Sequence, residues 1–167
     1  MPFQRLTYHF ATELAASRPH AYRWATDYRS NDFDLSDVKG RRKVEKLTDD
    51  LILLTDSFDD DPFDSRQGAR TVKVKLVHLF PDRWMWTSTH VAGPAKYSQF
   101  LYQLTARGPT ASTLHFTGNQ VELLKGRPNR TSIQRRAQEL KREDSHLWAQ
   151  FSAALARELS QPAPKTG

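Results

Sequence analysis

Alternation of apolar and polar residues marks several stretches of this chain and predicts β-strands with one buried face. In residues 3–14, for example, Leu6, Tyr8 and Phe10 fall on one side of such a strand. Pro81 precedes Asp82 between two predicted strands, which is typical of a tight turn. We expect six further strands, at residues 41–47, 50–58, 69–80, 83–91, 97–106 and 111–124.

A helical period replaces this alternation after the first strand. Ser17 and the nearby Pro19 are typical of a helix start, and aromatic residues continue the helical pattern as far as Tyr28. The polar stretch that follows leaves room for a second short helix, with Phe33 and Leu35 packing inward. We therefore expect one or two short helices between the first and second strands.

Beyond Gly126 and Pro128 the apolar residues recur every three to four positions, which predicts a long amphipathic helix over residues 131–160. At ~1.5 Å per residue it would be on the order of 40 Å long, enough to cross a whole sheet. The predicted fold is α+β: a curved antiparallel sheet of about seven strands wrapped on a long C-terminal helix. We expect residues 1–160 to form a single domain and residues 161–167 to be a disordered tail.

The composition restricts the possible chemistry. The 167 residues include no cysteine, which excludes disulfides, thiolate metal sites and a cysteine nucleophile, and suits a reducing cytoplasm. No apolar segment approaches the ~18 residues needed to span a membrane, and residues 1–14 lack the continuous apolar core of a signal peptide. We therefore expect a cytoplasmic protein with no membrane span.

Charge is distributed unevenly around a formal net charge of +6. Residues 125–142 hold seven Lys or Arg and a single acid, Glu139. A basic surface of this kind binds nucleic acid or an acidic partner in some proteins, although most charged runs are solvated faces. Residues 56–64 hold five aspartates, but they lack the spacing of a calcium-binding loop, which favours a solvated hairpin.

Two segments resemble one known superfamily. Residues 16–33, ASRPHAYRWATDYRSNDF, carry a proline-containing helix start, a buried aromatic at Trp24 and the pair Asp27 and Tyr28. Residues 102–116, YQLTARGPTASTLHF, are similar to the penultimate hairpin of the same group. Together with the order of the elements, these motifs resemble the START-like, or SRPBCC, superfamily of polyketide cyclase and Bet v 1-type proteins over nearly the whole chain.

This resemblance implies a helix-grip fold with a hydrophobic cavity between the sheet and the C-terminal helix. Members of the superfamily bind lipids, sterols, polyketides or other apolar ligands, and some cyclise or dehydrate them. The matching motifs contain no invariant catalytic residue. The choice among these activities therefore depends on the residues that face the cavity.

The stretch RWMWTSTH, residues 83–90, holds two of the four tryptophans. In a strand, Trp84, Trp86, Ser88 and His90 share one face, and we predict that this face points inward. Large aromatic residues on such a face are either core packing or the walls of a ligand cavity. A shift of one residue in the strand register would reverse the assignment.

Two other histidines are candidates for the same cavity. His78 lies on the valine-rich face of its strand, and Lys73 and Lys75 lie on the other face. We predict that the valine-rich face points inward. With His90, His78 and His115 would place two or three imidazoles near one cavity, where they perform acid–base chemistry or hydrogen-bond within the core. The spacing shows no His-x-His pattern, so we predict no metal site and no cofactor.

Asp144 lies near the apolar stripe of the long helix, where an apolar residue is expected. If it is buried, it is a candidate general acid or base, or a ligand anchor, with a raised pKa. If it lies at the edge of the stripe, it is solvated and pairs with Lys141 or Arg142. The sequence favours the solvated position, because one helical residue is only ~100° of rotation.

Three functions are consistent with these patterns. The first is binding of a small hydrophobic or amphipathic ligand (lipid-, polyketide- or aromatic-like) in the cavity. The second is a cyclase- or dehydratase-type enzyme on the same scaffold, which requires a polar pair such as His90 or His115 beside Asp144. The third is an interaction module in which residues 125–142 bind an acidic partner or RNA. The candidate ligand-binding residues are Trp84, Trp86, Tyr102 and Trp148 as apolar walls, with His78, His90, His115 and Asp144 as polar anchors.

Overall fold

The computed structural model describes residues 3–59 and 70–161. Within these residues, seven strands, two α-helices and two 3-10 turns follow one another in an order close to the predicted one. They are β1 (Phe3–Leu14), α1 (Arg18–Thr26), η1 (Asp32–Leu35), β2 (Arg41–Thr48), β3 (Leu51–Phe58), β4 (Thr71–Phe80), η2 (Pro81–Arg83), β5 (Met85–Ala92), β6 (Gln99–Ala106), β7 (Ser112–Leu123) and α2 (Arg130–Ser160).

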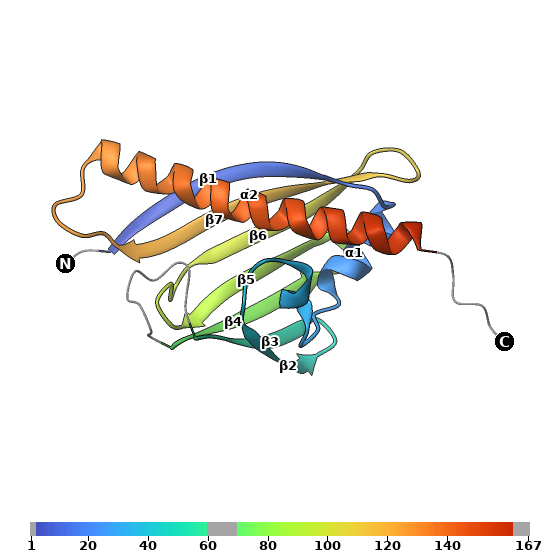
Figure 1. Cartoon of the computed structure of the whole chain (residues 1–167), viewed down its shortest axis with the longest axis horizontal. Helices are drawn as coiled ribbons and strands as arrows, with labels where there is room; N and C mark the ends of the chain where they lie inside the picture. Colours follow the sequence, from blue (N-terminus) through green and yellow to red (C-terminus); the bar gives the residue numbers. More distant parts are fainter. Residues whose placement is uncertain (1–2, 60–69, 162–167) are drawn as a thin grey trace.

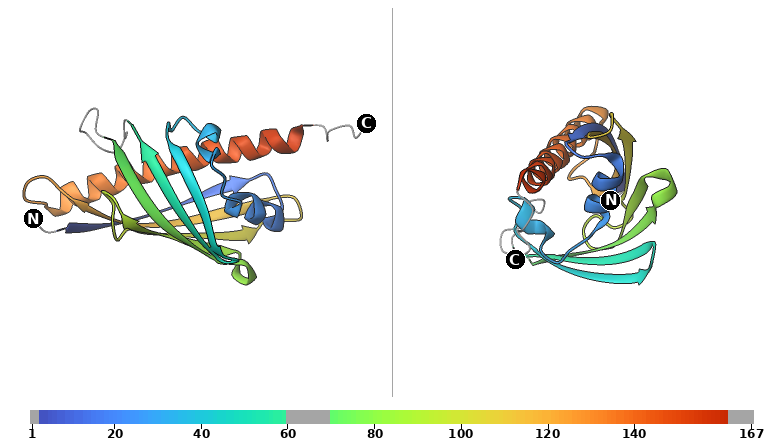
Figure 2. Two further views of the ribbon diagram at one scale, coloured as in Figure 1. Left: turned by 90° about the horizontal axis from the view of Figure 1, so that it is seen from below. Right: turned by 90° about the vertical axis from the view of Figure 1, so that its right-hand side faces the viewer.

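The strands form one antiparallel sheet in the order β1-β7-β6-β5-β4-β3-β2. Figure 1 shows α2 lying across this sheet, and the end view in Figure 2 shows the sheet curving around the interior that α2 covers. The 3-10 turn η1 contacts both α2 and β2, and so bridges the helix and the edge strand of the sheet. The predicted α+β helix-grip fold is therefore confirmed, with one short helix and a 3-10 turn after β1.

Helix α2 begins at Arg130, one residue before the predicted 131–160, and Asn129 caps it. Asn129 accepts a hydrogen bond from the backbone N–H of Ser132, and the Ser132 hydroxyl accepts one from the backbone N–H of Asn129. This reciprocal pair satisfies two otherwise unpaired backbone donors and fixes the start of the helix. Along α2, the side chains of Leu140, Trp148 and Leu155 are buried against the sheet.

Close packing between β1 and β7 places one polar side chain under α2. Tyr8 of β1 lies directly opposite Gly118 of β7. A Cβ atom at Gly118 would lie 2.5 Å from Tyr8 Cζ, so the ring occupies the space that a side chain would fill. Gly118 thereby allows the Tyr8 hydroxyl to reach Asp144 of α2, to which it donates a hydrogen bond.

Strand β4 faces the opposite way from the prediction. Lys73 and Val77 are buried on the concave side, whereas Val72 is 41% exposed. The valine-rich face therefore points to solvent, and the face that carries the lysines points inward. Buried partners stabilise the lysines there: Lys73 Nζ lies 5.4 Å from the ring centroid of Phe58. Leu35 was expected to be buried and is 37% exposed.

Several sequence predictions concern residues outside 3–59 and 70–161. The proposed tail falls almost entirely on residues 162–167, and three of the five aspartates of 56–64 lie within 60–69. Of the two aspartates that are described, Asp56 is buried in β3 and Asp59 is exposed. No helix among the described residues is long and apolar enough to cross a membrane.

Candidate functional site

A cavity of about 180 Å³ lies between the concave face of the sheet and the C-terminal half of α2. Strands β2 to β6, α1, η1 and α2 all contribute to it, so it is built from most of the fold. Its lining combines aromatic, aliphatic and charged side chains and includes Trp24, Tyr28, Asp32, Phe33, Arg42, Leu54, Lys75, Ser88, Tyr102, Leu147, Trp148 and Phe151.

Aromatic rings form one wall of the cavity. Tyr102 of β6 and Trp148 of α2 line it, with their ring centroids 5.7 Å apart. Trp86 of β5 stacks behind Tyr102 at 4.9 Å and is completely buried. Phe151 packs edge-on against Trp148 at 5.3 Å. Ring pairs at these separations attract one another beyond the area they bury, so the wall is held from both the sheet and the helix.

Charged side chains form another part of the lining. Arg42 of β2 donates two hydrogen bonds to Asp56 of β3, from Nε at 2.8 Å and from Nη2 at 3.0 Å. Its Nη1 donates a third to Asp32 of η1 at 2.9 Å. From β4, Lys75 Nζ lies 2.9 Å from Asp56 Oδ2. We call Asp32, Arg42, Asp56 and Lys75 the charged cluster.

Electrostatics keep the central carboxylate of the charged cluster ionised. Burial alone would raise the pKa of Asp56, but the charge of Lys75 and the hydrogen bonds and charge of Arg42 outweigh burial and hold that pKa at about 2. Burial lowers the pKa of Lys75, and the negative charge of Asp56 opposes this change. A carboxylate removed from water in this way is stable only while its cations remain in place.

Two aromatic rings hold the Arg42 guanidinium in position. Its Cζ atom lies 4.8 Å from the ring centroid of Phe33 and 5.6 Å from that of Tyr28. Phe33 in turn packs against Phe58 of β3 at 5.4 Å. Cation–π contacts of this kind are strongest where water is excluded, and only 10% of the Arg42 side chain is exposed. The segment after α1 therefore both closes the cavity and fixes its arginine.

Strand β5 has the predicted inward face. Trp86, Ser88 and His90 are 0%, 5% and 7% exposed, and Ser88 lines the cavity. His90 pairs with Lys75 across the strands. Burial, followed by the charges of Lys75 and Lys73, lowers the pKa of His90 to about 2, so its ring is neutral near pH 7. Its Nδ1 has no hydrogen-bond partner among the described residues, and the ring does not line the cavity.

Asp144 is half-buried on the side of α2 that faces β1, so the expectation of a solvated side chain is wrong. Its carboxylate accepts a hydrogen bond from the Tyr8 hydroxyl instead of pairing with Lys141 or Arg142. Burial raises the pKa of Asp144 to about 6; the Tyr8 hydrogen bond opposes the rise, and the charge of Glu143 adds to it. Asp144 does not line the cavity, which lies nearer the C-terminal end of α2.

This raised pKa predicts a pH-dependent effect of Asp144→Asn. Because the folded-state pKa of about 6 exceeds the ordinary 3.8, the stability associated with Asp144 is fully present below pH 3.8 and is lost as pH rises through 6. Asn does not ionise. Between pH 4 and pH 7, the free energy of unfolding of the variant should therefore rise relative to that of the wild type by up to about 3 kcal/mol. Urea unfolding at several pH values measures this gain, with Asp82→Asn as the exposed control. A difference between variant and wild type that stays constant with pH would contradict the prediction.

The remaining candidate residues lie away from the cavity. Trp84 precedes β5 in a left-handed conformation with φ 53°, and its ring packs edge-on against Tyr22 of α1 at 5.7 Å. His78 pairs with Thr87 on the convex side of the sheet. His115 is exposed on β7. The predicted inward position of His78 is therefore wrong, because the face of β4 is reversed, and His115, a candidate for the same cavity, lies outside it.

The charged cluster was not predicted from the sequence. Arg42, Asp56 and Lys75 come from three different strands, and each was assigned to solvent or left without a role. One signal pointed to them: Lys73 and Lys75 alternate within a long apolar strand and an aspartate occurs within the strand before it, an arrangement that fits a buried ion pair. Its interpretation required the β3–β4 register, which places Leu54 opposite Lys75 and Asp56 opposite Lys73.

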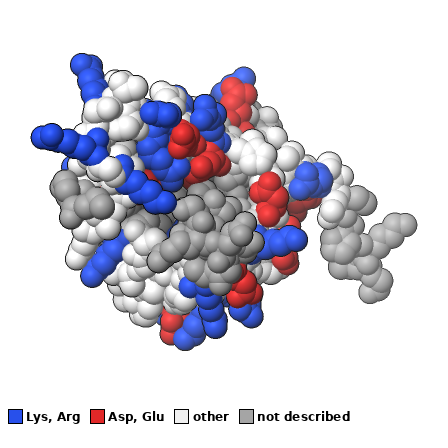
Figure 3. Space-filling view, turned by 60° about the vertical axis from the view of Figure 1, so that its left-hand side comes forward, with Lys and Arg blue, Asp and Glu red and all other residues white. Residues whose placement is uncertain are grey.

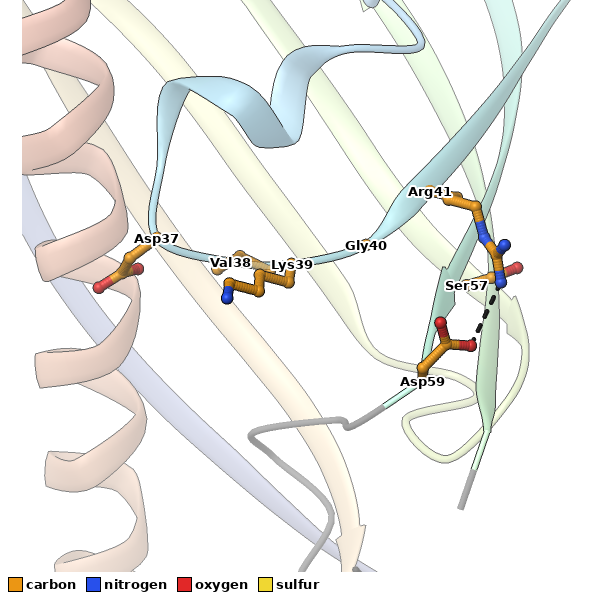
Figure 4. Close-up of a pocket in the computed structure, with 7 residues that line it drawn as sticks. All are labelled: Asp37, Val38, Lys39, Gly40, Arg41, Ser57 and Asp59. Carbon is orange, nitrogen blue, oxygen red and sulfur yellow. Dashed lines mark hydrogen bonds and ion pairs between the residues drawn. The ribbon is translucent and has the colours of Figure 1, made fainter. Parts of the chain in front are cut away.

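A second pocket, of about 610 Å³, opens at the surface beside the start of β2. Figure 4 shows the connection from Asp37 to Gly40 on one side of it, and Arg41 and Asp59 on the other. Arg41 and Asp59 form an ion pair at 3.2 Å, with 68% and 78% of their side chains exposed. The seven residues that line this pocket offer no desolvated polar group, so it is a weaker candidate than the cavity between the sheet and α2.

Residues 3–59 and 70–161 form neither a metal centre nor the pair of His90 or His115 with Asp144 that catalysis would require. No group of three or more His, Asp or Glu in these ranges could hold a metal ion. His90 and Asp144 share no hydrogen bond, and neither contributes to the pKa shift of the other. The polar pair that the enzyme hypothesis required is therefore not present among the described residues.

Comparisons with known proteins agree with the fold. No protein-family model and no curated protein matches the sequence. Among solved structures, the Zhui aromatase/cyclase from Streptomyces sp. R1128 matches with a TM-score of 0.68 and 10% identity, over 93% of each chain. Norcoclaurine synthase from Thalictrum flavum, in complex with dopamine and hydroxybenzaldehyde, matches with a TM-score of 0.66 and 10% identity, over 96% of this chain and 91% of that chain.

A START superfamily protein from Mycobacterium smegmatis matches with a TM-score of 0.63 and 14% identity, over 90% of this chain and 97% of that chain. Identities this low show a shared fold and leave the function open. The resemblance read from the sequence is confirmed at that level: the chain has a START-like, helix-grip fold.

Proposed function

We propose that this protein binds a small amphipathic ligand, built on a single aromatic ring, in the cavity between the sheet and α2. The observation that carries the proposal is that an aromatic wall and the largely buried cations Arg42 and Lys75 line the same space between the sheet and α2. Ligand sites usually combine an apolar lining with a few convergent polar groups. Tyr102 and Trp148 would contact the ring, and Lys75 and Ser88 would orient its polar group.

The volume of the cavity limits the size of the ligand. About 180 Å³ is slightly more than the ~150 Å³ of a cavity that holds one benzene molecule, and less than the ~300 Å³ at the lower end of drug-sized sites. A ring with one or two small substituents fits this space. A lipid chain or a folded polyketide would require Trp148 or Phe151 to move. Of the three ligand types consistent with the sequence, we therefore propose the aromatic one.

Hydrogen-bond donors in the charged cluster favour a ligand with an acceptor oxygen. Asp56 accepts from both Arg42 and Lys75, so its oxygens are already occupied. The Lys75 ammonium has three N–H groups, and Asp56 takes one. Its other donors and the Ser88 hydroxyl are best matched by a carbonyl, phenol or carboxylate oxygen on the ligand.

Two structural neighbours support the ligand class. One is described as an aromatase/cyclase, and the other is in complex with dopamine and hydroxybenzaldehyde, each of which has a single ring. These names describe those proteins. For this chain they support the choice of an aromatic ligand, which rests on the cavity itself.

Binding of one-ring compounds tests the proposal directly. We expect isothermal titration calorimetry to detect 4-hydroxybenzaldehyde or benzoate, and to detect toluene more weakly because it offers no acceptor oxygen. Ser88→Leu should weaken binding by about tenfold or more, because the larger side chain occupies part of the cavity.

Thr87→Leu is the matched control for this substitution. Thr87 is the neighbouring residue on the same strand, but it pairs with His78 on the convex face of the sheet. Its variant should bind like the wild type. Equal losses in the two variants, or no binding of any of the compounds to the wild type, would overturn the proposal.

A further inference from the structure

Exposed apolar side chains gather at one end of the molecule. Among the described residues, nine large hydrophobic side chains are exposed, and five of them lie at the end of the sheet where β1 begins and β7 finishes. Phe3 and Leu123 are directly paired across β1 and β7 and are 57% and 55% exposed. Tyr97, in the connection between β5 and β6, is 64% exposed. Val72 and Val91 complete the group, at the start of β4 and near the end of β5.

Basic residues surround these apolar side chains. Arg5, Arg70, Lys96, Lys125, Arg127 and Arg130 are all exposed, and none forms an ion pair with a described residue. The nearby Glu122 is already bound by Arg136, with Nη2 2.8 Å from Oε1. We call these six cations and five apolar residues the basic end. Figure 3 turns this side of the molecule toward the viewer and shows Lys and Arg side chains projecting from several parts of it.

Acidic residues do not cancel this charge. Residues 60–69, which the structure does not describe, link two strands that meet at the basic end, and by sequence they carry three Asp and one Arg. The cations still outnumber the acids when these are counted. The charge therefore complements an anionic partner whether or not that segment contributes to the surface.

We infer that the basic end docks on an anionic lipid surface. Cations near a membrane are attracted to acidic headgroups, and exposed Phe and Leu side chains gain by entering the boundary of the acyl chains. Tyrosine is enriched at this same interface, where its ring is buried and its hydroxyl stays in water. The exposed ring of Tyr97 is free to make such a contact. Lys96 lies beside it, with Nζ 4.9 Å from the centroid of the Tyr97 ring.

The apolar residues decide between lipid and nucleic acid. Phosphates of RNA would satisfy the same cations, and Tyr97 alone could stack on a base. Phe3 and Leu123 are paired at the end of the sheet and exposed. A nucleic acid offers such aliphatic and aromatic side chains no apolar layer to enter, whereas a bilayer offers its acyl chains. The predicted basic segment 125–142 is thus split: Arg136 is engaged by Glu122, and Lys125, Arg127 and Arg130 belong to the basic end.

Vesicle co-sedimentation tests this inference with the full chain. We expect binding to phosphatidylcholine vesicles that contain about a third phosphatidylserine, and on the order of tenfold less binding to phosphatidylcholine alone. The triple variant Lys125→Gln, Arg127→Gln, Arg130→Gln should lose at least about tenfold in affinity for the acidic vesicles. The double variant Phe3→Ser, Leu123→Ser should lose the binding that remains at high salt, because apolar insertion is not screened.

A matched control lies at the opposite end of the sheet. Phe80 is 40% exposed and Arg83 is exposed near it, so Phe80→Ser with Arg83→Gln changes the same residue types elsewhere. This variant should bind vesicles like the wild type. Equal losses in the control, no vesicle binding by the wild type, or tighter binding to poly(U) that is indifferent to Phe3 and Leu123 would each overturn the inference.

Discussion

Replacing Asp56 with Asn is expected to lower the free energy of unfolding by about 3–5 kcal/mol. The carboxylate is completely buried and bound by Arg42 and Lys75. Asn preserves the shape of the side chain but removes its charge, so Lys75 would lose its counter-charge and Arg42 would keep only Asp32. Urea unfolding at pH 7, followed by tryptophan fluorescence, measures the loss.

Asp59→Asn is the control for this substitution, because Asp59 also pairs with an arginine but is exposed. Exposed pairs of this kind contribute little, so its effect should be close to the error of the measurement. pH gives a second readout. The pKa of Asp56, about 2, lies below the ordinary 3.8, so its stabilising contribution is present above pH 3.8 and is lost as pH falls through 2. The gap between wild type and Asp56→Asn should narrow over that range; similar losses in both variants would contradict the buried ion pair.

Replacing Trp148 with Ala should have a comparably large effect on stability and a distinct effect on binding. Trp148 is 8% exposed and contacts Trp86, Tyr102 and Phe151. Removal of a buried tryptophan costs about 3–5 kcal/mol, from lost burial and from the space left behind. That space adjoins the cavity, so the variant should accept a two-ring compound such as 2-naphthaldehyde that the wild type binds weakly.

Leu159→Ala controls for changes to α2 as such. Leu159 lies on the same helix, is 43% exposed and does not line the cavity. Its variant should keep nearly full stability and the ligand preference of the wild type. If Trp148→Ala loses stability but does not change ligand preference, the helix packs as described and the ring site is wrong.

The order of elements was predictable because it depends on local patterns. The strand-and-turn succession, the long helix after Pro128 and the inward face of Trp86 and His90 all follow from period and turn chemistry. These features require no knowledge of which strand lies beside which. The exact start of α2 was less predictable, because it depends on the reciprocal hydrogen bonds between Asn129 and Ser132, which satisfy two backbone donors.

The charged part of the site was not predictable, because burial there contradicts residue type. Lys73 and Lys75 were assigned to solvent since an isolated lysine is costly to bury. The cost falls when Asp56 lies within 2.9 Å of Lys75, and that proximity depends on how β3 pairs with β4. The same reasoning applies to Asp144, whose partner Tyr8 lies at the other end of the sequence.

The position of β1 has a consequence for the order in which the protein is assembled. β1 is synthesised before the six other strands described, but among them it pairs with β7 alone, so that Phe3 meets Leu123. A nascent chain therefore carries an unpaired, half-apolar strand until β7 has left the ribosome, and α2 must follow before the interior closes. Such non-local pairing slows folding and leaves surface available to chaperones. Release of α2, rather than formation of the β2–β7 hairpins, therefore sets the moment at which the cavity can form.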